Sequence, residues 1–119
     1  MPTIDPCSLD GFVVAAGLVG YAALFALGDG SVIVRDRGES RRVAAHDGGI
    51  LAAQISADGK AMLSAGDDGR VVRTTPDGKI EVLFEKPGKW LDQLAEGPQG
   101  AIACAAGRMA GLSKKAATA

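Results

Sequence analysis

Short apolar runs separated by tight-turn sequences give the clearest pattern in the chain. From residue 50 to residue 84, apolar side chains alternate with polar or small ones over a few positions at a time. Alternation with a period of two residues is typical of β-strands with one buried face. The pattern predicts four strands joined in an antiparallel, up-and-down sheet, and the runs lie at 50–56, 61–66, 70–75 and 79–84.

Asp-Gly pairs mark the turns between these runs. The chain holds six such pairs, at residues 10–11, 29–30, 47–48, 58–59, 68–69 and 77–78. Asp-Gly is a strong hairpin signal because a type I′ turn needs a positive φ at both of its central residues. Several of the pairs stand between apolar runs, and the sequence predicts hairpins there.

The strand pattern recurs at a fixed interval. Residues 28–36 read GDGSVIVRD, and residues 67–75, which lie 39 positions later, read DDGRVVRTT. A period near 40 residues with a glycine turn in each unit predicts a repeat architecture of small stacked sheets. The first unit would hold strands at 12–19, 21–27, 31–36 and 41–45, and a third unit would hold strands at 91–95 and 101–106 around a turn at 98–100.

Residues 11–28 are open to a second interpretation. They contain no charged residue and no proline over 18 positions, which is the lower length limit of a membrane-spanning helix. The ten preceding residues contain two aspartates and no basic residue, which disfavours a secretory signal. In the 39-residue frame, Gly20 aligns with Gly59 and becomes a turn between two buried strands. The repeat is the main interpretation, and a small membrane-anchored protein with residues 11–28 as its span is the alternative.

Composition narrows the class of protein. The 119 residues suit one ordinary domain, and with 47% hydrophobic but only 4% aromatic residues the core must be built from Ala, Val, Leu and Ile. Thirteen basic and 14 acidic residues give a net charge of −1, which disfavours binding to nucleic acid or to anionic lipid. Cys7 and Cys104 form neither a disulfide framework nor a metal motif. Reduced thiols in the cytoplasm fit best, and a single bridge stays open.

The middle unit resembles the WD-repeat (beta-transducin repeat) unit of propeller proteins. That family's pattern is a Gly-His, a strand, a Ser-Pro-Asp-Gly turn, a small-residue strand with Ser, an Asp-Gly turn and a strand ending in Trp-Asp. The matching residues are, in order, His46, Ser56-Ala57-Asp58-Gly59, Ser64 and Asp68-Gly69. The sequence departs from the pattern where Thr74-Thr75 and, in the first unit, Arg35-Asp36 stand in place of Trp-Asp.

The resemblance implies an all-β fold, a partial β-propeller of about two and a half four-stranded antiparallel blades that do not close. The expected parts are an N-terminal segment 1–11, blade 1 at 12–46, blade 2 at 47–88, a partial blade 3 at 89–110 and a disordered tail 111–119. It also implies a buried structural hydrogen-bond network of His46, Ser64, Asp68 and, in the place of the Trp, Thr74.

The function that the resemblance implies is non-enzymatic, a scaffold for protein–protein interaction with no cofactor and no metal. Partners would be other proteins that dock on the loops between strands and between blades, and the candidate contact residues there are Asp47, Asp67 and Trp90. Trp90 has an alternative, burial under the loop that enters the third unit. A Ser–His–Asp hydrolase is disfavoured because no nucleophile elbow is present, and calcium is disfavoured because the aspartates lack the spacing of an EF-hand.

The expected number of blades is too small to close a propeller ring. A closed propeller has about four to eight blades, so two and a half blades leave sheet faces and strand edges uncovered. The chain would be a truncated form of a protein of about 300 residues, or several copies would assemble into a ring, with self-association through open blade edges. Isolated chain is expected to aggregate or to be marginally stable.

Overall fold

The strands that the structure describes are all antiparallel. The computed structural model describes residues 12–97, 101–106 and 109–114. These residues form three antiparallel sheets and no helix, so the all-β expectation is confirmed. Sheet 1 contains β1 (Val13–Val19), β2 (Ala22–Leu27), β3 (Ser31–Asp36) and β4 (Glu39–Ala44); sheet 2 contains β5 (Ile50–Ile55), β6 (Met62–Gly66), β7 (Arg70–Thr74) and β8 (Ile80–Glu85); sheet 3 contains β9 (Gln93–Glu96), β10 (Ala101–Ala106) and β11 (Met109–Lys114).

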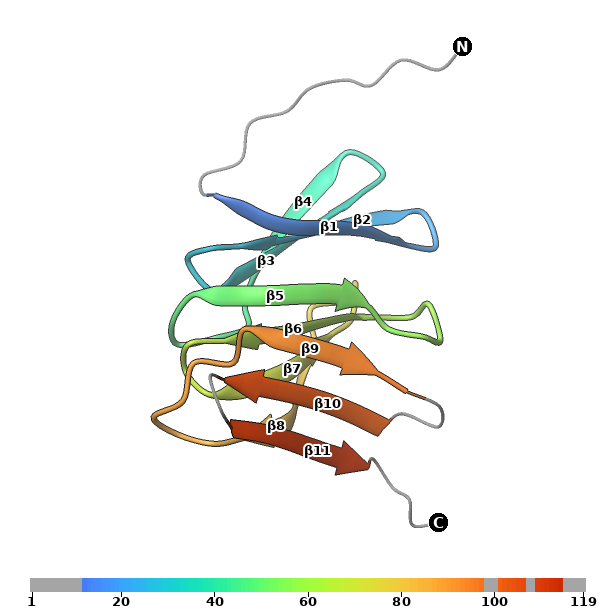
Figure 1. Cartoon of the computed structure of the whole chain (residues 1–119). Helices are drawn as coiled ribbons and strands as arrows, with labels where there is room; N and C mark the ends of the chain where they lie inside the picture. Colours follow the sequence, from blue (N-terminus) through green and yellow to red (C-terminus); the bar gives the residue numbers. More distant parts are fainter. Residues whose placement is uncertain (1–11, 98–100, 107–108, 115–119) are drawn as a thin grey trace.

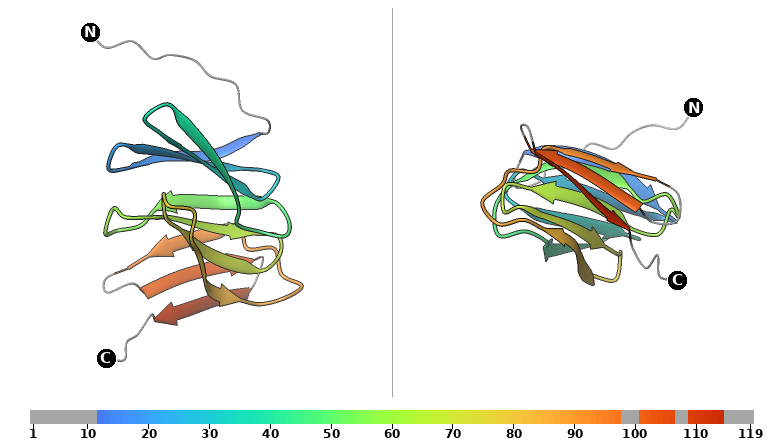
Figure 2. Two further views of the ribbon diagram at one scale, coloured as in Figure 1. Left: turned by 180° about the vertical axis from the view of Figure 1, so that it is seen from behind. Right: turned by 60° about the horizontal axis from the view of Figure 1, so that its bottom comes forward.

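The three sheets stack face to face in chain order (Figure 1). In each sheet neighbouring strands in sequence are also neighbours in space, as in an up-and-down meander. The first strands of the sheets lie side by side, β1 against β5 and β5 against β9. Sheet 2 therefore lies between the other two, and the stack stays open at both ends (Figures 1 and 2).

Two apolar layers hold the stack together. Between sheets 1 and 2 lies a core that includes Leu24, Val32, Met62 and Val72, all fully buried. Between sheets 2 and 3 lies a second core of Leu63, Ala65, Val71, Leu91, Ile102 and Cys104. Because side chains alternate along a strand, sheet 2 places Met62 on one face and Leu63 on the other, and both are buried.

The Asp-Gly turns have a different geometry from the predicted type I′. At residues 29–30, 58–59, 68–69 and 77–78 only the glycine has a positive φ, between 71° and 98°. In each turn the aspartate carboxylate accepts the backbone N–H two residues later, at 2.9 to 3.2 Å. This is an Asx turn that ends in a glycine, with Asp chosen for its side-chain acceptor. Positive φ at both central residues occurs instead at Arg37 (55°) and Gly38 (84°), between β3 and β4.

Two further expectations need correction. Residues 13–19 and 22–27 form two strands that turn at Gly20, so residues 11–28 are not a continuous helix. Nowhere in the described ranges is there a helix with the length and apolar character to cross a membrane. The expected tail is partly wrong as well, because β11 includes residues 111–114 and pairs with β10 along its whole length. The predicted turn at 98–100 and the segments 1–11 and 115–119 lie outside the described residues.

Candidate functional site

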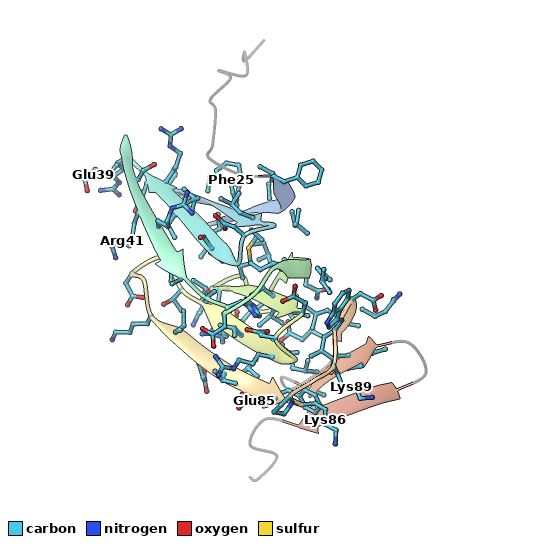
Figure 3. All side chains as sticks on the ribbon, turned by 90° about the vertical axis from the view of Figure 1, so that its left-hand side faces the viewer. Phe25, Glu39, Arg41, Glu85, Lys86 and Lys89 are labelled. Atoms are coloured by element: carbon cyan, nitrogen blue, oxygen red, sulfur yellow. The ribbon has the colours of Figure 1, made fainter. Side chains whose placement is uncertain are left out.

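At one end of the strands, two hairpin turns and the two connections between sheets lie together and form what we call the loop face, residues 28–30, 45–49, 67–69 and 86–90. Each connection between sheets crosses a hairpin turn of the preceding sheet. The N–H of His46 donates to the carbonyl of Gly30 at 3.0 Å, and the N–H of Lys86 donates to the carbonyl of Gly69 at 2.7 Å. Figure 3 views the molecule toward this end, with Glu85, Lys86 and Lys89 labelled. The repeated crossing fixes the loops to one another.

His46 joins this face to the interior of sheet 2. Its Nδ1 lies 2.9 Å and 3.1 Å from the two carboxylate oxygens of Asp68, and its Nε2 lies 2.8 Å from Oγ of Ser64. A carboxylate only accepts hydrogen bonds, so Nδ1 carries the proton, and in neutral His46 Nε2 accepts from the Ser64 hydroxyl. The imidazole is fully buried and Ser64 is fully buried. Three of the four predicted network residues are therefore in direct contact.

Asp68 is held ionised by its donors. Burial alone would raise the pKa of its carboxyl group, but the hydrogen bonds from His46 and from the backbone N–H groups of Asp47 and Arg70 outweigh burial. The pKa of Asp68 is therefore lowered from its ordinary value of 3.8. The carboxylate ties the connection 45–49, which supplies His46 and Asp47, to the start of β7, where Arg70 lies.

Thr74, the fourth predicted member, does not join the network. It is fully buried at the end of β7, and its hydroxyl has no hydrogen-bond partner among the described residues. The bond from Thr74 to the network that the resemblance implies is therefore absent from the described part of the chain. A buried hydroxyl without a partner costs stability, because it has lost its bonds to water.

The order of contacts, Ser64 to His46 to Asp68, is that of a catalytic triad. The surroundings are unsuited to catalysis, because Ser64 lies in the middle of β6 with a fully buried side chain. A substrate carbonyl could reach its Oγ only if sheets 1 and 2 separated. The arrangement binds the connection 45–49 to sheet 2.

The three candidate contact residues all lie on the loop face but differ in exposure. The Asp47 side chain is 82% exposed, with its carboxylate 3.6 Å from the guanidinium of Arg70. Asp67 is half-buried and accepts the N–H of Gly49 at 2.9 Å, so it supports the loop. Trp90 is 68% exposed, which excludes burial under the loop, whereas its neighbour Leu91 is fully buried.

Arg70 is a residue of this face that sequence reasoning missed. Its guanidinium Nε donates to a Glu85 carboxylate oxygen at 2.9 Å, and the same group faces Asp47. Arg70 thus links β7 to the edge strand β8 and to the connection 45–49. The signal available in the sequence was its position directly after the Asp68-Gly69 turn, where its N–H also donates to Asp68.

Candidate metal ligands do not gather in the described part of the chain, where no three His, Cys, Asp or Glu side chains form a group that could hold an ion. The aspartate turns at 29–30, 58–59, 68–69 and 77–78 are spread over both ends of the strands, and their carboxylates accept backbone N–H groups. Cys104 is buried in the layer between sheets 2 and 3.

Comparison with known proteins adds little. No family model and no curated protein matches the sequence. Among solved structures, the chain is similar to the crystal structure of the computationally designed Ika4 protein, with a TM-score of 0.49 and 14% sequence identity. The match covers 90% of this chain and 93% of that one. A likeness at this level supports no conclusion about this chain.

Proposed function

We propose that this chain is a non-enzymatic scaffold of the WD-repeat type, whose loop face binds another protein. The observation that carries the proposal is Trp90. Its indole is 68% exposed although Leu91 beside it is fully buried and the preceding turn is bonded, Lys89 N–H to the Lys86 carbonyl at 3.3 Å. A large aromatic side chain held outward on a fixed backbone is typical of binding hot spots.

The His46 network supports the same function. It uses the polar side chains at the loop face to fix the connection 45–49, and it leaves Ser64 inaccessible as a nucleophile. Rigid loops lower the entropic cost of binding, because fewer conformations are lost when a partner docks. The proposal includes a cytoplasmic location, where a thiol such as that of Cys104 stays reduced.

Two exposed aromatic residues at opposite ends of the sheets allow a matched test. Tyr21, in the turn between β1 and β2, is 89% exposed and lies away from the loop face. Protein captured from cells on the immobilised wild-type chain should also be captured by Tyr21→Ala. Capture should fall by about tenfold or more with Trp90→Ala, because truncating a central Trp costs about 2 kcal/mol or more.

As a control, both variants must be shown to fold like the wild type. Both side chains are exposed, so circular dichroism and thermal melting of the two variants should match those of the wild type. If no captured protein distinguishes Trp90→Ala from Tyr21→Ala, the loop face is not a binding surface and the proposal fails.

A further inference from the structure

Each sheet of the stack has two distinct faces, and sheet 2 shows what each face does. One face of sheet 2, with Met62 and Val72, packs against sheet 1. The other face, with Leu63, Ala65 and Val71, packs against sheet 3. Because the units repeat, each face of sheets 1 and 3 can be expected to pack against the same kind of surface as the corresponding face of sheet 2. The outward faces of the stack can therefore be compared with faces that are covered.

The outward face of sheet 1 is apolar around Phe25 and basic toward the edge strand β4, where Ile33 is paired with Arg42. Leu24 and Val32 point toward sheet 2, so the next residues along the strands, Phe25 and Ile33, lie on the opposite face. Phe25 and Ile33 are a cross-strand pair on β2 and β3. They precede Ser64 and Val72, which form a cross-strand pair on sheet 2, by one repeat of 39 residues. This outward face thus corresponds to the face of sheet 2 that sheet 1 covers.

The outward face of sheet 3 corresponds to the complementary face. The bond from Gly97 N–H to the Ala101 carbonyl, 2.8 Å, repeats the bond from Ser56 N–H to the Ala61 carbonyl, also 2.8 Å. This places Ala103 in the position of Leu63, whose side chain packs against sheet 3. Ala103 therefore lies on the outward face of sheet 3. The alanines leave a shallow hollow of about 250 Å³, whose lining includes Ala95, Ala103, Ala105 and Ala110.

We infer that the outward face of sheet 3 binds the outward face of sheet 1 of a second copy of this chain, head to tail. Phe25, which is half-buried, would pack against the small residues around Ala103, with its cross-strand partner Ile33 (7% exposed) beside it. This contact continues the stacking already present twice within the chain. Two copies contain six sheets, within the roughly four to eight that a closed propeller holds, so the complex is a ring of two chains.

Sheet faces, and not strand edges, are the surfaces for this association. The edge strand β4 carries exposed Glu39, Arg41 and Arg42, and charged edges oppose strand pairing. The inference is independent of the proposed function, because the loop face is not part of the contact.

The test is the mass of the full chain and its variants in solution, by size-exclusion chromatography with light scattering. Wild type should be a dimer. Phe25→Glu and Ala103→Glu should each raise the dimer dissociation constant by more than about a hundredfold, because each would bury an unpaired carboxylate. An equimolar mixture of the two variants should form a 1:1 dimer again, since one interface then joins two unaltered faces.

Further variants keep the test decisive. Val82 lies on the edge strand β8 and is 46% exposed. Val82→Glu should stay dimeric if the sheet faces form the contact. If the copies instead associated by pairing of edge strands, this variant should be monomeric. Ala16→Glu, on the same face as Phe25 and opposite it on β1, replaces Phe25→Glu if circular dichroism shows that variant unfolded. Three results would each overturn the inference: a monomeric wild type, loss of the dimer in only one of the two face variants, or a mixture that stays monomeric.

Discussion

At the scale of single residues, polar side chains in this chain act mainly on the backbone. Asp68 accepts from two backbone N–H groups and from His46, and the aspartates of the turns 29–30, 58–59 and 77–78 each accept the N–H two residues later. Such bonds are needed because a turn between buried strands leaves N–H groups with no partner in the sheet ladder. The hydrogen bonding that recurs in these turns is therefore structural, and it predicts which substitutions are costly.

Ser64 and Thr74 are buried hydroxyl groups with opposite expected behaviour. Ser64→Ala leaves Nε2 of His46 without its partner and should lower the free energy of unfolding by about 1–3 kcal/mol. Thr74→Val removes an unpaired hydroxyl at nearly constant volume and should leave stability unchanged or raise it by about 1 kcal/mol. Urea unfolding of the two variants checks both, and a Thr74→Val variant as unstable as Ser64→Ala would show that the Thr74 hydroxyl has a partner.

The lowered pKa of Asp58 predicts that the free energy of unfolding depends on pH in the acid range. The Ser56 hydroxyl, the Lys60 N–H and the Arg73 guanidinium lower the pKa of its carboxyl group to about 2 from 3.8. Because the folded pKa is the lower one, the stabilisation is present above pH 4 and is lost as the pH falls toward 2. The pKa values of Asp29, Asp68 and Asp77 are lowered too, so the acid loss is shared.

The matched variant for this prediction is Asp58→Asn, which keeps a side-chain acceptor but does not titrate. Its urea midpoint should lie below that of the wild type at pH 6, and the two should converge near pH 2. A constant difference across this range would mean that Asp58 has an ordinary pKa in the folded chain.

At the scale of elements, the strands and their order could be read from the sequence, but the turn geometry could not. Alternating runs such as 70–75 and the 39-residue repeat identify the sheets, because burial of one face requires that alternation. Asp-Gly identifies a turn without its type, since both type I′ and the Asx turn use these two residues. Strand β11 was missed because its residues are small and polar, and its pairing with β10 decides its structure.

The candidate site, too, could be predicted only in part from the sequence. His46, Ser64 and Asp68 could be predicted as neighbours because the resemblance supplies their spacing, which the strands then bring together. The isolation of Thr74 and the bridging role of Arg70 depend on side-chain length and direction across strands. Single-sequence patterns do not encode those distances.

A turn can require glycine because of its positive φ or because another segment lies too close for a Cβ, and Gly59 and Gly69 allow the two reasons to be compared. Both have a positive φ, 79° and 71°. A Cβ at Gly69 would collide with the backbone of Lys86 and Lys89, whereas a Cβ at Gly59 would meet nothing within 4 Å. Gly59→Ala should therefore cost only the backbone strain, about 1–2 kcal/mol. Gly69→Ala should cost more, because the connection 86–90 must move, and chemical denaturation that gives equal losses would contradict the crossing of these loops.

At the scale of the whole molecule, stability should depend on protein concentration. The outward faces of sheets 1 and 3 include apolar side chains such as Phe25 and Ala103, and an interface that covers them would stabilise the folded chain by mass action. The melting temperature should rise as the concentration is raised from about 1 to 100 μM, because only the folded state associates. A melting temperature independent of concentration, together with a sharp transition, would indicate a self-sufficient monomer.

The central claim is that the chain is a stack of antiparallel sheets whose polar residues fix the loops. The most direct measurement is the set of nuclear Overhauser contacts between backbone protons in solution. The structure predicts contacts across the pairs Leu18–Ala23 and Ser64–Val72, with a turn at Gly20. Consecutive amide–amide contacts of a helix through residues 13–27, or no contact between β6 and β7, would contradict the account.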